Sequence, residues 1–194
     1  DGSLKYNNKT KEEGSTINQF SLDEYNGNLR VALSGGEGSR VVVFDKKLNK
    51  IGETANLSKG EKMYSTRFIG NKAYMVTYKN TDPLYVIYLS NPSNPEVLGK
   101  LKIPGYSTYL HPYDETHLIG IGMQTEEKVY RDSQGRVTST SAVITGMKMA
   151  LFDVSDVNNP KQISQTIIGD RRTTSAILTN HKALLFSKEK GIIA

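Results

Sequence analysis

Short apolar runs separated by turn-forming residues occupy most of the chain, and this pattern predicts β-strands. In the runs, Val, Ile, Leu and Tyr are consecutive or alternate with polar residues, and clusters of Gly, Asn, Asp and Pro separate them. No segment has a convincing apolar period of about 3.6 residues, so we expect little helix. The strands predicted in the first half of the chain are 17–23, 28–34, 39–45, 48–54, 62–68, 72–78, 83–90 and 95–102.

The predicted strands recur as a unit. An apolar stretch that follows a turn begins near Leu29 and returns near Ala73, Leu118 and Ala183. The first two steps are 44 and 45 residues, whereas the third is 65. Units of four short strands that repeat at about 40 to 50 residues are typical of a β-propeller, in which each sheet, or blade, buries its faces against its neighbours. An irregular β-sandwich would also contain short strands, but it gives no reason for the units to resemble one another.

The repeat predicts one all-β domain over residues 1–194, a β-propeller or a partial propeller of about three to four four-stranded blades. Because edge strands expose unpaired backbone groups, we expect the two ends to pair with each other or with another copy of the chain. Two to three strands are expected within 172–194. The approximate units are 17–61, 62–105, 106–170 and 171–194, with 1–16 as a strand of a preceding or composite blade.

The longer third unit contains an insertion. The stretch "LFDVSDVNNPKQIS" at 151–164 parallels "VIYLSNPSNPEVLG" at 86–99 with the same offset of 65, so the extra residues lie within 123–145. Two alternating polar runs flank a Ser-Gln-Gly turn at 133–135, which predicts a β-hairpin that projects from the third blade. We expect this hairpin to carry the partner-binding surface, unless it is only a tolerated elaboration of a loop.

Several phrases of the sequence carry a resemblance to a known family. The most specific are "STYLHPYDE" and "DPLYVI". They stand within or beside the longer segments "NQFSLDEYNGNLRVA", "YSTRFIGNKAYMVTYKNTDPLYVI", "LSNPSNPEVLGKLKIPGYSTYLHPYDETHLIGIG" and "FDVSDVNNPKQISQTIIGD". On these segments the chain resembles the bacterial and archaeal family of secreted proteins with a C-terminal β-propeller domain, which is distantly akin to WD-type propellers. The resemblance implies an extracellular or cell-envelope protein, and it implies no particular biochemical role.

Composition and charge exclude several classes of protein. The 25 Lys and Arg residues are interspersed with 20 Asp and Glu, and only Lys46-Lys47 and Arg171-Arg172 approach a basic stripe, so nucleic acid is not an expected partner. Without cysteine, the chain has no disulfide, no thiolate metal site and no cysteine nucleophile. No stretch approaches the roughly 18 apolar residues of a membrane span, so we expect no transmembrane segment.

The sequence shows no motif for catalysis or for a cofactor. The glycines at 35–40 and 120–125 fit neither a dinucleotide-binding nor a phosphate-binding loop, and no G-x-S-x-G nucleophile elbow occurs. The three histidines, His111, His117 and His181, lack the i, i+4 helical spacing of zinc enzymes. We therefore expect no cofactor, no metal ion and no catalytic residue in this chain.

One polar cluster remains as a candidate ligand-binding site. The stretch "YSTYLHPYDETHLIGIG" at 106–122 begins as part of the repeat, because Tyr106-Ser107-Thr108 reproduces Tyr64-Ser65-Thr66 of the preceding unit. Most of the cluster is therefore expected to be scaffold. The polar residues without a counterpart, which we expect to contact a ligand, are His111, Tyr113 and Asp114.

These observations favour an extracytoplasmic binding or scaffold module over an enzyme. Propellers present loops on rigid blades, and the sequence assembles no catalytic set. The expected partner is a protein or a cell-surface polymer, and the edge strands add self-association as a further expectation. The alternative is a hydrolase or lyase that acts on a surface polysaccharide or peptide, with its site in the propeller channel.

Overall fold

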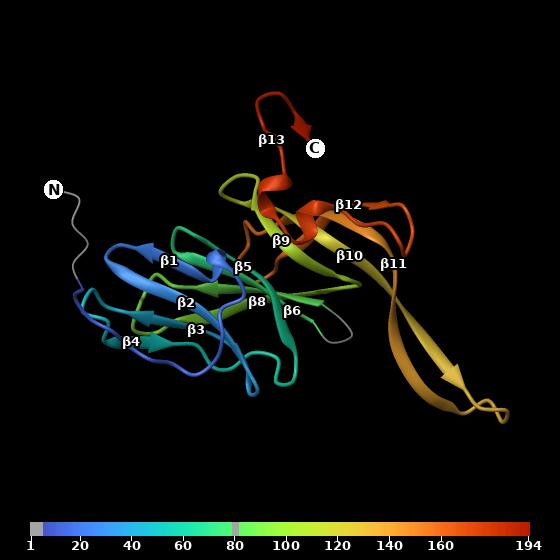
Figure 1. Cartoon of the computed structure of the whole chain (residues 1–194), viewed down its shortest axis with the longest axis horizontal. Coiled ribbons are helices and arrows are strands. Elements are labelled where there is room, and N and C mark those ends of the chain that lie inside the picture. The colour runs from blue at the N-terminus through green and yellow to red at the C-terminus, as the bar shows by residue number, and fades with distance from the viewer. Residues whose placement is uncertain (1–5, 79–81) are drawn as a thin grey trace.

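The computed structural model describes residues 6–78 and 82–194, and it contains three four-stranded antiparallel sheets (Figure 1). Each of the three sheets is a meander, because neighbouring strands in the sheet are also neighbours in the sequence. The predicted all-β, partial-propeller architecture is confirmed. The first sheet contains β1 (Leu22–Tyr25), β2 (Asn28–Gly35), β3 (Gly38–Phe44) and β4 (Lys50–Glu53).

The other two large sheets follow in sequence order. The second sheet contains β5 (Lys62–Ile69), β6 (Lys72–Tyr78), β7 (Asp82–Tyr88) and β8 (Glu96–Ile103). The third sheet contains β9 (Tyr106–Pro112), β10 (His117–Arg131), β11 (Val137–Asp153) and β12 (Lys161–Ile168). Most strands lie close to their predicted ranges, because Gly, Asn and Pro turns in the sequence mark where they end.

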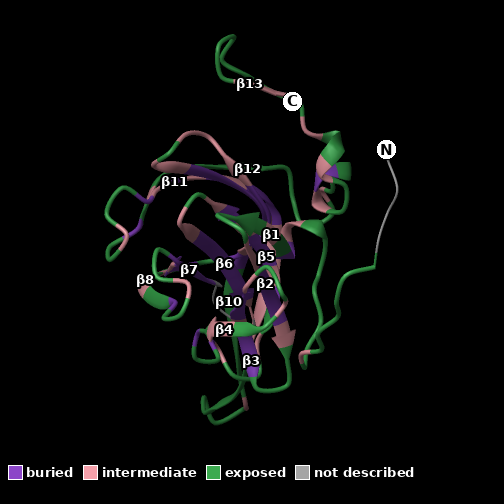
Figure 2. Ribbon diagram, turned by 90° about the vertical axis from the view of Figure 1, so that its left-hand side faces the viewer, coloured by how far each residue is buried: buried purple, intermediate pink, exposed green. Residues whose placement is uncertain are grey.

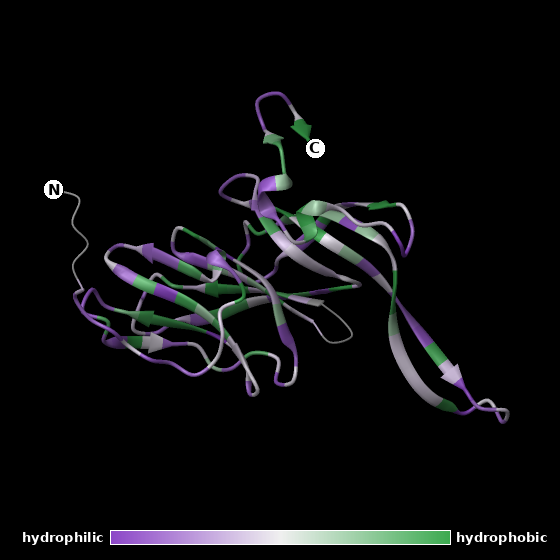
Figure 3. Ribbon diagram, viewed as in Figure 1, coloured by the Kyte–Doolittle hydropathy of each residue, from purple (hydrophilic) through white to green (hydrophobic). Residues whose placement is uncertain are grey.

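The hydrophobic core lies in the joints between the sheets. Met75 of β6 packs in one cluster with Val43 of the first sheet, whereas the adjacent residue, Tyr74, packs in a second cluster with Leu118 of the third sheet. Alternate residues of a strand point to opposite faces, so the second sheet buries both of its faces. Burial is concentrated in these central strands (Figure 2), which are also rich in hydrophobic residues (Figure 3).

A recurring contact joins each outer strand to the next sheet. Gly52 of β4 faces the β7–β8 turn, where an added Cβ would lie 3.0 Å from Cδ of Pro95. Gly99 of β8 faces the β11–β12 turn in the same way, with an added Cβ only 2.8 Å from Cδ of Pro160. Gly52 pairs with Val43 and Gly99 pairs with Val86, and a β-bulge follows each pair. The equivalent residue of the third sheet is Ser164 of β12. The sheets therefore stack in one repeated way.

The insertion in the third unit forms the hairpin predicted from the sequence. β10 and β11 remain paired as far as Arg131 and Val137, and Asp132–Arg136 makes the turn between them. β9 and β12 stop pairing at Met123 and Met147, so the outer part is a two-stranded ribbon. This ribbon points away from the three sheets (Figure 1).

The first predicted strand, 17–23, is wrong in its first half. Residues Gln19–Ser21 form the 3₁₀ helix η1, and β1 begins only at Leu22. The side chain of Asn18 explains the difference, because its Oδ1 accepts a hydrogen bond from the backbone N–H of Phe20 at 2.9 Å. This cap turns the chain before the strand can begin.

The strands expected within 172–194 are only partly formed. The segment contains the 3₁₀ helices η2 (Ala176–Leu178) and η3 (His181–Ala183), and a short hairpin of β13 (Phe186–Ser187) and β14 (Ile192–Ile193). Oδ1 of Asn180 accepts from the backbone N–H of Lys182 at 3.1 Å, and such local capping competes with strand formation. Across the described ranges, no helix has the length and apolar character needed to cross a membrane.

The two ends of the described chain do not share a sheet. Residues 6–14 form no strand, Ser15 makes a single bridge to Ser34, and residues 1–5 of the predicted strand lie outside the described residues. Phe20 of η1 and His181 of η3 make the contact between the ends, with ring centroids 4.9 Å apart. The prediction of a composite blade made from both ends is therefore wrong for the described residues, and pairing with another copy stays a prediction.

Candidate functional site

The predicted residues His111, Tyr113 and Asp114 lie where β9 turns into β10. The turn forms because the backbone N–H groups of Tyr113 and Asp114 both donate to the carbonyl of His117, at 3.0 and 3.3 Å. The C-terminal hairpin packs against this turn through Phe186 of β13, whose ring contacts both His111 and Tyr113. The structure thus brings the three predicted residues into one cluster.

Asp114 is an ionised hydrogen-bond acceptor at the centre of this turn. Its Oδ1 accepts from the backbone N–H of Thr116 at 2.9 Å and lies 2.9 Å from Nδ1 of His117, while Oδ2 accepts from Nζ of Lys188 at 3.1 Å. The hydrogen bond from the Thr116 backbone, together with those from His117 and Lys188, holds the pKa of the Asp114 carboxyl far below its usual range. Asp114 is therefore suited to hold the turn and the hairpin together, and it is not suited to donate a proton.

His111 is held as a neutral ring. Its ring packs against Phe186 with centroids 4.6 Å apart, and its Nδ1 lies 3.1 Å from the hydroxyl of Tyr109. Burial, and next the guanidinium of Arg67, lower the pKa of His111. At neutral pH this ring can make hydrogen bonds and ring contacts, but it offers no positive charge to a ligand.

Tyr113 joins the aromatic part of the cluster to its charged part. The centroid of its ring lies 5.9 Å from that of Phe186, and Nζ of Lys188 lies 4.4 Å from the ring centroid of Tyr113. An ammonium group over a tyrosine ring is worth about 0.5–1 kcal/mol at an exposed site. Lys188 thereby contacts Tyr113 and Asp114 together. We call the set of His111, Tyr113, Asp114, Phe186 and Lys188 the β9–β10 cluster.

An apolar pocket of about 340 Å³ opens beside the β9–β10 cluster. Tyr113, Phe186 and Lys188 form one side of it, and residues of β10, β11 and β12 such as Leu151 form the other. Ser164 also lines this pocket. It is the equivalent of Gly52 and Gly99, which contact a turn of the next sheet. An apolar lining with one ammonium group at its edge suits an apolar ligand group.

A chain of hydrogen bonds connects Arg67 of the second sheet to His111. Arg67 of β5 donates from Nε to the carbonyl of Leu110 at 2.9 Å and from Nη2 to the hydroxyl of Tyr109 at 3.0 Å. Its guanidinium also lies 3.9 Å from the ring centroid of Phe20. Burial lowers the pKa of Arg67, yet an arginine stays charged at neutral pH. The hydrogen bonds from Arg67 to Tyr109 and between Tyr109 and His111 fix the orientation of the His111 ring.

The chemistry that the β9–β10 cluster offers is binding chemistry. Within the part of the chain that the structure describes, no group of three or more His, Asp or Glu side chains is placed to hold a metal ion. His111 and His117 have different partners, Tyr109 and Asp114. The cluster presents hydrogen-bonding groups, aromatic rings and one ammonium group.

Two residues of the cluster, Phe186 and Lys188, were not predicted from the sequence. The contact between Lys188 and Asp114 joins residues 74 positions apart. No spacing or motif in the sequence relates them, because the contact depends on how the C-terminal segment folds back onto the third sheet.

Comparison with known proteins identifies the family. All of residues 1–194 match the family described as the β-propeller domain, and the chain belongs to that family. It is 46% identical over 162 residues to an uncharacterised protein of Methanocaldococcus jannaschii, a match that covers 80% of this chain and 23% of the relative. It is 38% identical over 180 residues to an uncharacterised protein of Archaeoglobus fulgidus, which covers 92% of this chain and 26% of that relative. The chain spans about a quarter of the length of these curated relatives.

The family assignment confirms the propeller part of the resemblance drawn from the sequence. Both relatives are archaeal proteins, which agrees with the archaeal members of the family that the resemblance names. Location and partner are properties of the whole protein, and they are treated as proposals below.

Proposed function

We propose that this chain is a rigid binding module that works outside the cytoplasm, with a protein or a cell-surface polymer as its partner. The observation that supports the proposal most directly is the ribbon that extends β10 and β11 beyond the third sheet (Figure 1). Residues 126–131 and 133–140 of this ribbon are exposed. An isolated two-stranded ribbon is only marginally stable in water, so contact with a partner gives a reason for its length.

The tip of the ribbon combines apolar exposure with a fixed shape. Tyr130 is 42% exposed and Val137 is 54% exposed. Asp132 holds the turn, because its Oδ1 accepts from the backbone N–H groups of Gln134 and Arg136 at 2.9 Å each, and its Oδ2 accepts from Nε of Arg136 at 2.9 Å. A surface that is already ordered loses less conformational entropy when it binds.

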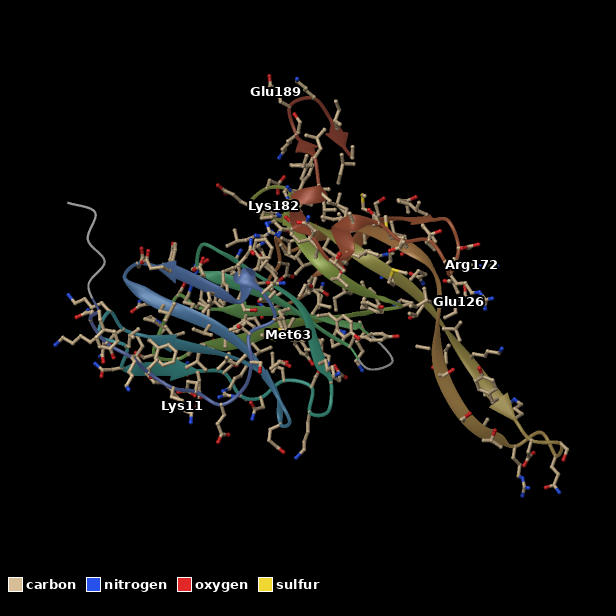
Figure 4. All side chains as sticks on the ribbon, viewed as in Figure 1. Lys11, Met63, Glu126, Arg172, Lys182 and Glu189 are labelled. Carbon is tan, nitrogen blue, oxygen red and sulfur yellow. The ribbon has the colours of Figure 1, made fainter. Side chains whose placement is uncertain are left out.

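The open edges of the ribbon favour a polypeptide partner. After Met123, β10 pairs only with β11, and before Met147, β11 pairs only with β10 in the described residues. The outward-facing backbone N–H and C=O groups of both strands can therefore accept an added strand from another chain. Figure 4 shows Glu126 where the ribbon leaves the body, so the open edges begin close to the third sheet.

The extracytoplasmic location rests on the resemblance to secreted propeller proteins that the sequence carries. Treatment of intact cells of the source organism with a protease tests it. The full-length protein should be cleaved without lysis. Protection until the cells are lysed, under conditions in which a known surface protein is cleaved, would place the module inside the cell and overturn this part of the proposal.

The binding role is tested with a ribbon variant. The purified chain should co-sediment with cell envelopes of the source organism, and replacement of residues 126–142 by a short Gly-Ser linker should abolish this binding. Tyr130→Ser should weaken it, whereas Ile163→Ser, an exposed apolar residue on β12 outside the ribbon, is the matched control. Envelopes digested with protease should no longer bind the chain if the partner is a protein. Equal binding of the intact chain and the ribbon variant would show that the ribbon is not the binding surface.

A further inference from the structure

A second pocket, of about 320 Å³, lies in the joint between the first and second sheets. Tyr25, Asn28 and Arg30 line it from the first sheet, and Asn71 and Ser90 line it from the second. It shares no residue with the pocket beside the β9–β10 cluster. A volume near 300 Å³ is at the small end of the range for ligand sites, so this joint pocket fits a small molecule.

Arg30 stands in the joint beside this pocket at the position where the next joint has a tyrosine. Arg30 is the third residue of β2, and the third residue of β6 is Tyr74. In the joint between the second and third sheets, Tyr74 is fully buried and packs with Val154, and this burial raises its pKa to about 12. Arg30 instead bridges the two sheets, donating from Nε to Oδ2 of Asp23 in the first sheet at 2.8 Å and from Nη1 to the carbonyl of Gly70 in the second sheet at 2.6 Å. A guanidinium that hydrogen-bonds to both sheets therefore stands in the first joint where a phenol ring stands in the second.

Arg30 is a fixed hydrogen-bond donor in the wall of the joint pocket. It is only 3% exposed, and the rings of Tyr25 and Phe68 lie 4.7 and 5.1 Å from its Cζ atom. A guanidinium has five N–H bonds, and the contacts with Asp23 and Gly70 use three of them. The remaining two N–H bonds have no hydrogen-bond partner among the described residues.

The charges around the joint pocket disfavour an ionic ligand. Arg30 is balanced by Asp23, with which it forms an ion pair. The neighbouring carboxylate of Glu24 accepts from the backbone N–H of Gly27 at 2.7 Å. The pocket therefore carries no excess positive charge to attract an anion, and the two neighbouring carboxylates are already engaged by donors of the chain.

Asparagine side chains supply the rest of the polar lining. Those of Asn26 and Asn28 make no hydrogen bond with any described residue, and both residues line the pocket. Nδ2 of Asn71 donates to Oγ of Ser90 at 2.7 Å, which leaves the side-chain Oδ1 of Asn71 and the Ser90 hydroxyl proton for a ligand. Each amide can donate and accept, which matches the paired donor and acceptor character of a sugar hydroxyl group. The ring of Tyr25 can cover a C–H face of the same molecule.

We propose that the joint pocket binds a neutral sugar, either free or as the terminal unit of a glycan. The guanidinium N–H bonds, the amides and the Ser90 hydroxyl bind its hydroxyl groups, and Tyr25 packs against its ring. This proposal does not depend on the ribbon. A chain in which the linker replaces 126–142 should bind the sugar as tightly as the intact chain does, so the two proposals fail separately.

Ligand-observed NMR titration tests the proposal, with methyl glycosides of glucose, galactose, mannose and N-acetylglucosamine as probes. At least one glycoside should bind saturably at millimolar concentration. Asn71→Ala should weaken that binding about fivefold, as expected for the loss of one hydrogen bond. Asn26→Gly should weaken it similarly without disturbing the turn, because Asn26 has a φ of 53°, which glycine adopts readily. Asn158→Ala, an exposed asparagine in the β11–β12 turn, is the matched control and should leave the affinity unchanged.

Substitution of Arg30 supplies the strongest test. Arg30→Tyr places in the first joint the residue type that Tyr74 supplies in the second joint. This variant should no longer bind the sugar, because it lacks the guanidinium donors. If this variant does not fold, the two asparagine variants still decide the question. The proposal is overturned if no glycoside binds, if Asn71→Ala and Asn26→Gly bind as well as the unmodified chain, or if acetate or inorganic phosphate occupies the pocket in preference to every sugar.

Discussion

Nζ of Lys188 lies 3.1 Å from Oδ2 of Asp114, and the same Nζ lies 4.4 Å from the ring centroid of Tyr113. One ammonium group therefore attaches the C-terminal hairpin to the turn between β9 and β10. Because the Asp114 and Lys188 side chains are partly exposed, the pair itself is worth less than about 1 kcal/mol. Its importance lies in closing one side of the pocket beside the β9–β10 cluster.

Asp114→Asn should make the stability of the protein less dependent on acid pH. The folded-state pKa of Asp114 lies below the unfolded value of about 3.9, so its ionised form contributes stability that is fully present above about pH 4 and is lost as the pH falls further. We expect the variant to unfold more easily than the unmodified chain at pH 7, and the difference to shrink below pH 4. Urea unfolding across this range measures it. Glu115→Gln, in the same turn, is the control, and a difference that stays constant with pH would contradict the prediction.

His111→Phe should alter the pH dependence in a different window. The folded-state pKa of His111 lies below the unfolded value of about 6.5, so the unfolded chain binds the proton first and stability falls as the pH drops below 6.5. Phenylalanine keeps the ring contact with Phe186 but cannot titrate. The free energy of unfolding of the variant should therefore change less between pH 7 and pH 5 than that of the unmodified chain. Parallel pH profiles of the two proteins would show that His111 does not titrate as expected.

Gly99→Ala should destabilise the fold. The added methyl group would lie 2.8 Å from Cδ of Pro160 and would also clash with the carbonyl of Val157, and such overpacking costs about 1–3 kcal/mol. Gly36→Ala is the matched control, because an added Cβ there meets nothing within 4 Å. Chemical denaturation of both variants measures the difference. If the two substitutions had equal effects, the contact between the outer strand and the next turn would not be a close-packed joint.

Replacement of residues 126–142 by a Gly-Ser linker should leave the thermal unfolding temperature within a few degrees of that of the intact chain. The replaced residues are exposed or partly exposed, whereas the buried parts of β10 and β11, such as Leu118 and Phe152, are unchanged. Circular dichroism during heating checks this expectation. Collapse of the fold would mean that the ribbon is part of the core.

The strands and the ribbon could be predicted because their signals are local. Apolar runs end at Gly, Asn and Pro turns, and the Ser133-Gln134-Gly135 turn lies in the middle of the inserted hairpin. The failures at both ends of the chain are also local in origin. The side chains of Asn18 and Asn180 cap 3₁₀ turns where the repeat predicts strands, and a repeat alignment does not weigh such hydrogen bonds.

The candidate sites were less predictable because they depend on packing between distant segments. The sequence pointed to His111, Tyr113 and Asp114 as residues outside the repeat, but not to Phe186 and Lys188, which reach them by folding back. The sequence signal for the joint pocket is a single substitution within the repeat, which does not by itself predict a pocket. Arg30 departs from Tyr74 at the same place in the repeat, and the consequence of that change depends on the three-dimensional position of Asp23 and Gly70.

The repeated glycine on the outer strand also bears on the curvature of the whole assembly. Gly52 and Gly99 allow a proline-containing turn to come close at the outer edge of each joint. A larger residue at this position would push the outer edges of neighbouring sheets apart while the inner strands stay together, and the angle between the sheets would widen. The size of one side chain on the outer strand therefore limits how closely the outer edges of neighbouring sheets can approach.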